Sequence, residues 1–272
     1  MTERKKIIAC LDLKDGRLVK GVKFEELREI GEPLDYAKRY FEEGADELAF
    51  LDISSTEKSR AALLDLIRSV RAVVSIPICV GGGISSVSDM ENLIKAGADK
   101  VSVCSSALAR PELLSEMAKS YGSKSVMLAI DAKRVTPRDE TPRGEALRGV
   151  LSRWNAFAAG GRTDTGLDAV EWAKRAVELG AGEIMLNSID ADGTGDGYDL
   201  ELCTAVASAV PVPVIASGGA GSLEQIAGVL KNTPVTAALV ASFLHYGKST
   251  VREIKEYLLS QGISVEVLKE RN

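Results

Sequence analysis

Histidine and cysteine are scarce in this chain. Its 272 residues include one histidine, His245, and four cysteines, Cys10, Cys79, Cys104 and Cys203. No Cys-x-x-Cys pair is present, so one imidazole with scattered thiols predicts no zinc site and weakens any Ser-His-Asp mechanism. We expect buried free thiols, a reducing cytoplasmic location, and no metal or other cofactor.

Excess positive charge and long apolar runs are also missing. The net charge of −5 argues against a general nucleic-acid-binding protein, although it leaves room for local basic patches that hold phosphate. The apolar run that begins at residue 7 is too short for the core of a signal peptide or for a membrane span. Hydrophobic residues make up 45% of the chain and charged residues 27%, which is ordinary for a soluble globular protein.

The chain does have a regular alternation of short apolar runs with longer amphipathic segments. Eight runs have the length and composition of buried strands: 7–12, 47–53, 76–82, 100–104, 125–131, 183–188, 212–218 and 235–242. Helical patterns lie between them, for example at 33–44, 86–97, 111–122 and 166–180. Eight strand–helix units close into a (β/α)₈ TIM barrel of roughly 250 residues, whereas a doubly wound open sheet usually has fewer strands. We therefore predict an α/β fold with one barrel domain over 1–272.

The second half of the chain repeats features of the first. The first and fifth strands end in Asp12 and Asp131, and the third and seventh lead into the glycine-rich turns VGGGI (80–84) and ASGGAG (216–221). Catalytic residues of such barrels lie at the carboxyl ends of the strands. One aspartate there is more often a loop cap, but a matched set favours a functional site. The sequence thus predicts a half-barrel internal repeat.

The region 135–164, after the fifth strand, interrupts this rhythm. It contains the charged stretch TPRDETPRGEALRG (136–149), which is long for a connection. We expect a solvent-facing loop insertion, with or without a function of its own. A small hairpin that turns through Gly160 and Gly161 would follow it.

The two glycine-rich turns can bring backbone amides close to an anion. Neither has the spacing of a Walker or Rossmann fingerprint. One phosphate cup would use Gly219 with Ala241 and Ser242, and its half-barrel counterpart would use Gly83 and Ser105. Each run alone can be only a turn, but two matched cups at one barrel mouth predict a substrate that is phosphorylated at both ends.

Charged residues are also predicted at both ends of the barrel interior. Asp12 and Asp131 would lie between the two cups, where a pair of carboxylates can divide acid and base duties. Alternate residues of a strand share a face, so other charges of the same parity would point inward at the opposite end. These are Lys6, Glu47, Lys100 and Glu183. Their alternating signs would form either a structural salt-bridge plug or a gate for a small molecule.

Nine segments spread along the chain resemble the cyclase subunit of imidazole glycerol phosphate synthase. They are IIACLDLKDGRLVKG (7–21), ELREIGEP (26–33), ADELAFLDI (45–53), VGGGI (80–84), GADKVS (97–102), AIDAKRV (129–135), GGRTDTGLDAVEWAKRAVELGAGEI (160–184), SIDADGTGDGYD (188–199) and IASGGAG (215–221). The resemblance covers nearly the whole chain apart from part of 135–153. It implies an enzyme of histidine biosynthesis that converts the bisphosphorylated ribonucleotide PRFAR and ammonia to imidazole glycerol phosphate and AICAR. It also implies a partner, a glutaminase subunit that docks on the amino-terminal face and supplies ammonia through the barrel.

The resemblance further assigns roles to individual residues. Asp12 and Asp131 would be the general acid and base, and Lys20 would lie on a first loop that closes over the substrate. Gly83, Cys104 and Ser105 would line one phosphate cup; Asp192, Gly193, Gly219, Ala241 and Ser242 would line the other. Asn187 and Ser217 would face the reacting region. Lys6, Glu47, Lys100 and Glu183 match the family's charged ring at the ammonia entrance.

The chain departs from the family pattern at a few places. Cys104 stands where asparagine is usual, and Lys6 stands where arginine is usual, which keeps the charge but loses the planar fork. KNTP (231–234) replaces an expected Gly-Ala-Asp turn, and the insertion near 136–152 is longer than usual. None of these departures removes an aspartate.

Two alternatives stay open. The sister barrel, the phosphoribosylformimino aminoimidazole carboxamide ribotide isomerase of the preceding pathway step, would share the aspartates and both cups. The segments 12–21 and 26–33, together with the charged ring, favour the cyclase. A non-catalytic phosphosugar-binding subunit of the glutaminase is a candidate of a different class. None of these proteins requires a nucleic acid or a membrane as partner.

Overall fold

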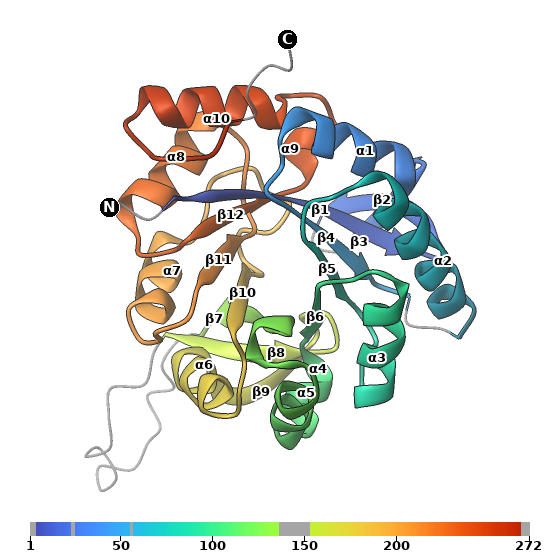
Figure 1. Cartoon of the computed structure of the whole chain (residues 1–272). Coiled ribbons are helices and arrows are strands. Elements are labelled where there is room, and N and C mark those ends of the chain that lie inside the picture. Colours follow the sequence, from blue (N-terminus) through green and yellow to red (C-terminus); the bar gives the residue numbers. More distant parts are fainter. Residues whose placement is uncertain (1–3, 23–24, 55–56, 136–152, 268–272) are drawn as a thin grey trace, which may run out of the picture.

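Eight parallel strands close into a barrel surrounded by helices in the computed structural model, which describes residues 4–22, 25–54, 57–135 and 153–267 (Figure 1). Around the barrel the strands are β1 (Lys6–Lys14), β4 (Glu47–Asp52), β5 (Ile78–Gly81), β6 (Lys100–Val103), β7 (Val126–Arg134), β10 (Glu183–Ser188), β11 (Val214–Ser217) and β12 (Ala237–Val240). Pairing of β12 with β1 and of β7 with β10 completes the ring. The predicted (β/α)₈ fold is confirmed.

Helices follow the strands and cover the outside of the barrel (Figure 1). They are α1 (Pro33–Glu43), α2 (Glu57–Val73), α3 (Val87–Ala96), α4 (Ser105–Ala109), α5 (Glu112–Tyr121), the 3₁₀ turn η1 (Ser123–Ser125), α6 (Ala169–Glu178), α7 (Leu200–Ala207), α8 (Leu223–Asn232), α9 (Ser242–His245) and α10 (Val251–Ser260). Local sequence sets their ends: Ser86 caps α3 by accepting the amide of Asp89, and Gly97 ends it in the left-handed conformation.

Several element boundaries differ from the sequence prediction, and two of them have a clear local cause. The helix predicted from residue 166 begins only at Ala169, because Asp168 accepts the amides of Val170 and Glu171 and so caps α6. The strand predicted over 235–242 ends at Val240, and Ser242 starts the short helix α9. Both shifts come from side-chain and backbone geometry at the element end, which hydrophobic periodicity does not report.

An antiparallel hairpin follows the first strand of each half. After β1 come β2 (Arg17–Val22) and β3 (Glu25–Gly31); after β7 come β8 (Trp154–Ala158) and β9 (Thr163–Asp168). The second hairpin confirms the predicted turn through Gly160 and Gly161, whereas the first was not predicted as strands. The rest of the predicted insertion, residues 136–152, lies outside the described residues.

Alternating strand residues build two apolar layers. One set points into the barrel and packs there: Ile8, Cys10, Ala49, Cys79, Met127, Met185, Ile215, Ala237 and Leu239. The residues of opposite parity, such as Ile7, Leu48 and Val80, face the helices and join the larger outer core. The middle of the interior is therefore filled mainly by apolar side chains, and the charged residues lie near its two ends.

The strand registers confirm the predicted half-barrel repeat. In the first half Glu47 lies opposite Ile8, and Asp12 lies opposite Leu51. In the second half Glu183 lies opposite Met127, and Asp131 lies opposite Asn187. Each half thus places a glutamate at the start of its second strand and an aspartate near the end of its first.

Substitution of Gly219 tests how tightly the turns at the carboxyl ends of the strands are packed. A Cβ there would lie 2.0 Å from the carbonyl oxygen of Gly197, and the φ of +103° disfavours any side chain. We expect Gly219→Ala to lower the free energy of unfolding by about 2 kcal/mol or more, and the melting temperature by roughly 4–8 °C. Thermal unfolding followed by circular dichroism measures both.

Gly228→Ala is the matched control. Gly228 lies within α8, and nothing stands within 4 Å of the Cβ that alanine would add. Alanine at this position should raise stability by about 0.5–1 kcal/mol, because glycine is the poorer helix former. Equal melting temperatures for the two variants would contradict the close packing at Gly219.

Candidate active site

A cavity opens at the carboxyl ends of the barrel strands, and both predicted catalytic aspartates line it. Nine of the residues predicted to act in the site contribute to its walls: Asp12, Asp131, Asn187, Asp192, Gly193, Ser217, Gly219, Ala241 and Ser242. They come from β1, β7, β10, β11, the turn after β11, the segment after β12, and the loop 189–199, which we call the cavity loop. The barrel therefore brings residues from both halves of the sequence to one opening.

Asp131 accepts hydrogen bonds on both oxygens of its carboxyl group. The amide nitrogen of Asn187 lies 3.1 Å from Oδ1, and the thiol sulfur of Cys104 lies 3.8 Å from Oδ2. The Ser217 hydroxyl donates in turn to the Asn187 carbonyl at 3.2 Å, which fixes the direction of the amide. Burial raises the pKa of Asp131 above its ordinary value, and the two hydrogen bonds oppose that rise.

Asp12 faces the same cavity from the first half of the barrel. Its side chain is buried, and the Cys10 thiol donates to its Oδ1 across 3.8 Å. The two aspartates thus occupy matched positions but have different neighbours. Different surroundings are what allow a carboxylate pair to divide proton donation from proton removal.

One side of the cavity brings together the residues predicted for one of the phosphate cups. The amide of Gly197 in the cavity loop donates to the carbonyl of Gly219 at 2.8 Å, and their close approach leaves no room for a Cβ. Asp192 and Gly193 line this side together with Ala241 and Ser242. The sequence prediction missed several lining residues, among them Thr194, Gly195, Phe243, Tyr246 and the exposed cation Lys248. For Phe243, Tyr246 and Lys248 the available signal was their position after β12, where barrels often bind phosphate.

The half-barrel counterpart of this cup is arranged differently. Gly83, Cys104 and Ser105 do not line the cavity. The Ser105 hydroxyl accepts the amide of Ala159, at the tip of the β8–β9 hairpin, at 2.9 Å. The backbone nevertheless repeats closely: φ and ψ are −125° and −93° at Cys104 and −126° and −86° at Ala241. The matched backbone extends the half-barrel repeat to these two positions, while the phosphate-binding role of either cup stays a prediction.

Three of the four predicted ring residues meet at the amino-terminal end of the barrel. Lys100 Nζ lies 2.7 Å from Glu47 Oε2 and 2.5 Å from Glu183 Oε2, and we call these residues the charged triad. Burial raises the pKa of Glu47 despite the nearby Lys100 ammonium. Burial disfavours the charged form of Lys100, but the two carboxylates outweigh it and raise the pKa of Lys100. The charges therefore depend on one another.

Two predicted residues stand apart from these groups. Lys6 is exposed at the start of β1, and among the described residues it forms no ion pair, although its charge favours the ionised form of Glu47. Lys20 belongs to β2 and lies opposite Arg28 in register, but its side chain is outside what the structure describes. The roles predicted for both residues stay predictions.

Elsewhere the described residues offer no metal site. No group of three histidine, cysteine, aspartate or glutamate side chains in 4–22, 25–54, 57–135 and 153–267 could hold an ion. His245 is buried, and its Nδ1 lies 2.5 Å from the Tyr40 hydroxyl, as expected of a packing residue. Within the same part of the chain, no helix combines the length and apolar character needed to cross a membrane.

Asn187 provides a test of the charge state of Asp131. Because its amide stabilises the ionised carboxylate, we expect Asn187→Leu to raise the pKa of Asp131 further. The pH titration of the Asp131 carboxyl carbon by ¹³C NMR measures this pKa. Ser217→Ala is the control, since Ser217 contacts Asn187 and not Asp131, and should shift the pKa less. A lower pKa in Asn187→Leu would contradict the described hydrogen bond.

Residues 6–250 match the model of a protein family described as histidine biosynthesis protein. The match spans most of the chain and includes both aspartates, the cavity loop and the charged triad. Its members are barrel enzymes of histidine biosynthesis, which include both the cyclase and the isomerase. The fold and the placement of the aspartates agree with such an enzyme. This chain belongs to the histidine biosynthesis protein family.

Proposed function

We propose that the protein is the ammonia-dependent cyclase of this family, which converts PRFAR and ammonia to imidazole glycerol phosphate and AICAR. The observation that carries the proposal is the presence of two polar sites at opposite ends of one barrel. Asp12 and Asp131 face the cavity at the carboxyl ends of the strands, and the charged triad lies at the amino ends. Both kinds of family enzyme need the first site, whereas a gate for ammonia at the second site would serve the cyclase alone.

The aspartates supply the proton transfers. Ring formation removes protons from the incoming ammonia nitrogen and delivers protons to the two leaving groups, water and AICAR. One carboxylate accepts a proton while the other, in its acid form, donates one. The raised pKa of Asp131 moves it towards the working pH, which makes proton exchange more effective in either direction.

The two ends of the substrate would bind on opposite sides of the mouth. One phosphate fits the cup beside Gly219 and Ser242, where Lys248 adds a positive charge to the cavity wall. The other would bind near Gly83 and Ser105, and the contact between Ser105 and Ala159 would have to open or rearrange to admit it. The substrate then spans the cavity with its reacting atoms between the aspartates.

Ammonia would reach these atoms along the barrel interior. The inner layer between the triad and Asp12 consists mainly of apolar side chains such as Ile8, Met127 and Ile215. Such a lining favours neutral ammonia over ammonium, because burying an unpaired charge is costly. A glutaminase subunit docked on the amino-terminal face would release ammonia beside the triad.

The isomerase is the second candidate, since it would use the same two aspartates and bisphosphate cavity. It would accept the substrate of the preceding pathway step and require no ammonia. A non-catalytic phosphosugar-binding subunit is the third candidate, and it would bind substrate without turnover. The surroundings of Asp131 argue against this third candidate. Asp131 is buried beside two hydrogen-bond donors, and burial raises its pKa. Perturbed pKa values of this kind are common among catalytic groups.

Asp12→Asn tests the catalytic role directly. The substitution keeps the size of the side chain but removes its proton-transfer capacity, so turnover of PRFAR with an ammonium salt should fall by at least about 100-fold. Substrate binding, followed by calorimetry, should persist. Asp35→Asn, at an exposed site in α1, is the control and should leave turnover unchanged. Undiminished turnover in Asp12→Asn would rule out the assigned role.

Glu183→Gln distinguishes the two interpretations of the charged triad, a gate for ammonia and a structural salt-bridge plug. Loss of one triad charge should reduce glutamine-dependent synthesis, in the presence of the glutaminase, more than synthesis from an ammonium salt. Glu178→Gln removes an exposed charge from α6 and should affect neither reaction. Equal losses in the two reactions would identify the triad as structural.

A further inference from the structure

The cavity loop is held to the barrel on its inner side. The Tyr198 hydroxyl donates to the Leu239 carbonyl at 3.0 Å, and the Gly197 amide donates to Gly219. Asp192, Gly193, Thr194 and Gly195, in the middle of the loop, line the cavity. The position of this segment therefore determines the shape of the predicted phosphate cup.

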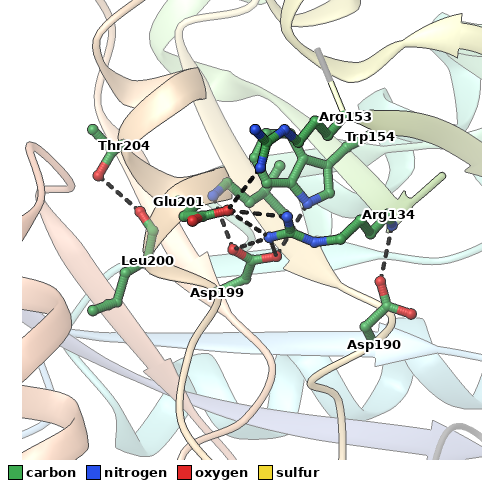
Figure 2. Close-up of polar contacts among 9 residues, drawn as sticks. Arg134, Arg153, Trp154, Asp190, Asp199, Leu200, Glu201 and Thr204 are labelled. Carbon is green, nitrogen blue, oxygen red and sulfur yellow. Dashed lines mark hydrogen bonds and ion pairs between the residues drawn. The ribbon is translucent and has the colours of Figure 1, made fainter. Parts of the chain in front are cut away.

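Arg134 holds the outer side of the same loop at both ends (Figure 2). Its backbone amide donates to Asp190 Oδ2 at 2.8 Å, near the start of the loop. Its guanidinium group lies 3.4 Å from both carboxylate oxygens of Asp199, the last loop residue, and 3.0 Å from Glu201 in the first turn of α7. A single residue thus bridges two loop positions that are nine residues apart in sequence.

Trp154 completes the arrangement. It lies opposite Arg134 in the β7–β8 ladder, and the guanidinium carbon stands 4.7 Å from the centre of its indole ring. The indole nitrogen donates to Asp199 Oδ2 at 3.1 Å, and Asp199 Oδ1 accepts the amide of Leu202 to cap α7. The Asp199 carboxylate therefore accepts hydrogen bonds from an indole, a backbone amide and a guanidinium group. Together these bonds order its side chain more than a lone surface ion pair would.

Arg134 also lies close to the reacting centre in sequence. It ends β7 three residues after Asp131. A rigid strand thus links the proposed acid–base group to the residue that holds the loop. The arrangement sets the loop's lining residues in a fixed position relative to Asp131.

We infer that Arg134 is a positioning residue, which with Asp199 and Trp154 clasps the cavity loop and so keeps the phosphate cup formed. Arg134 contacts no reacting atom in this role. The inference rests on the proposed function for the identity of the substrate, but the ordering of the loop by the clasp does not depend on it. The clasp acts on binding, so its loss affects KM rather than kcat.

Arg134→Met tests the clasp. The substitution keeps an unbranched apolar side chain and removes the charged guanidinium group. The KM for PRFAR should therefore rise by roughly tenfold, and kcat should change little. Hydrogen exchange of the amides in 190–199 should become faster in the free protein, and affinity for inorganic phosphate should fall. Arg153→Met is the control. It removes the same charge, and among the described residues the Arg153 guanidinium group pairs only with Glu201, at 4.0 Å.

Two milder variants keep the test decisive if Arg134→Met folds poorly. Arg134→Lys retains the charge without the fork, and Asp199→Asn retains the helix cap without the charge. Both should raise KM and speed exchange, by less than Arg134→Met. The inference is wrong if exchange in 190–199 is unchanged, if kcat falls with KM constant, or if Arg153→Met has the same effects.

The readouts also separate this inference from the proposed function. Hydrogen exchange and phosphate binding need no turnover. If the wild-type protein fails to convert PRFAR while exchange in 190–199 still responds to Arg134→Met, the cyclase proposal fails and the clasp stands. If turnover is normal and exchange does not respond, the clasp fails alone.

Discussion

Closure of the parallel barrel is the constraint on which the rest of the structure depends. Once β7 pairs with β10, every strand has two neighbours, and alternate residues must point either into the interior or towards the helices. Packed side chains, most of them apolar, line the middle of the interior. Charged groups can then lie only at its ends, where water or an opposite charge stabilises them.

The two ends have different characters because their charges are satisfied in different ways. At the amino end Lys100 forms ion pairs with both Glu47 and Glu183 within the protein itself. At the carboxyl end the donors to Asp131 among the described residues are an amide and a thiol, and burial raises the pKa of Asp131. A group held by its own ion pairs suits a structural or gating role, whereas a buried carboxylate held by uncharged donors suits proton transfer. The apolar layer between them separates these roles.

Features that depend on strand parity and repetition could be predicted from the sequence. The inward direction of Asp12 and Asp131, and the meeting of Lys100 with both glutamates, follow from alternation along each strand once a barrel is assumed. Features set by contacts between loops could not be predicted. The bond from Ala159 to Ser105 depends on how the β8–β9 hairpin folds back, and nothing in the sequence near either residue reports it. Arg134 and Asp199 likewise meet across 65 residues.

Lys6 illustrates the limit of the parity argument. Its position on β1 has the correct parity, yet its side chain is exposed at the strand end, and the three remaining residues form their two ion pairs without it. The direction of a long, flexible charged side chain at the end of a barrel depends on access to water as much as on the direction of the backbone.

The central claim is that the two aspartates serve ring formation with ammonia rather than isomerisation. The most direct measurement is to supply the purified wild-type protein separately with PRFAR plus an ammonium salt at alkaline pH and with the isomerase substrate alone, and to identify the products. Our account predicts imidazole glycerol phosphate and AICAR from the first mixture and no conversion in the second. Conversion of the isomerase substrate without ammonia, together with no conversion of PRFAR, would contradict this account.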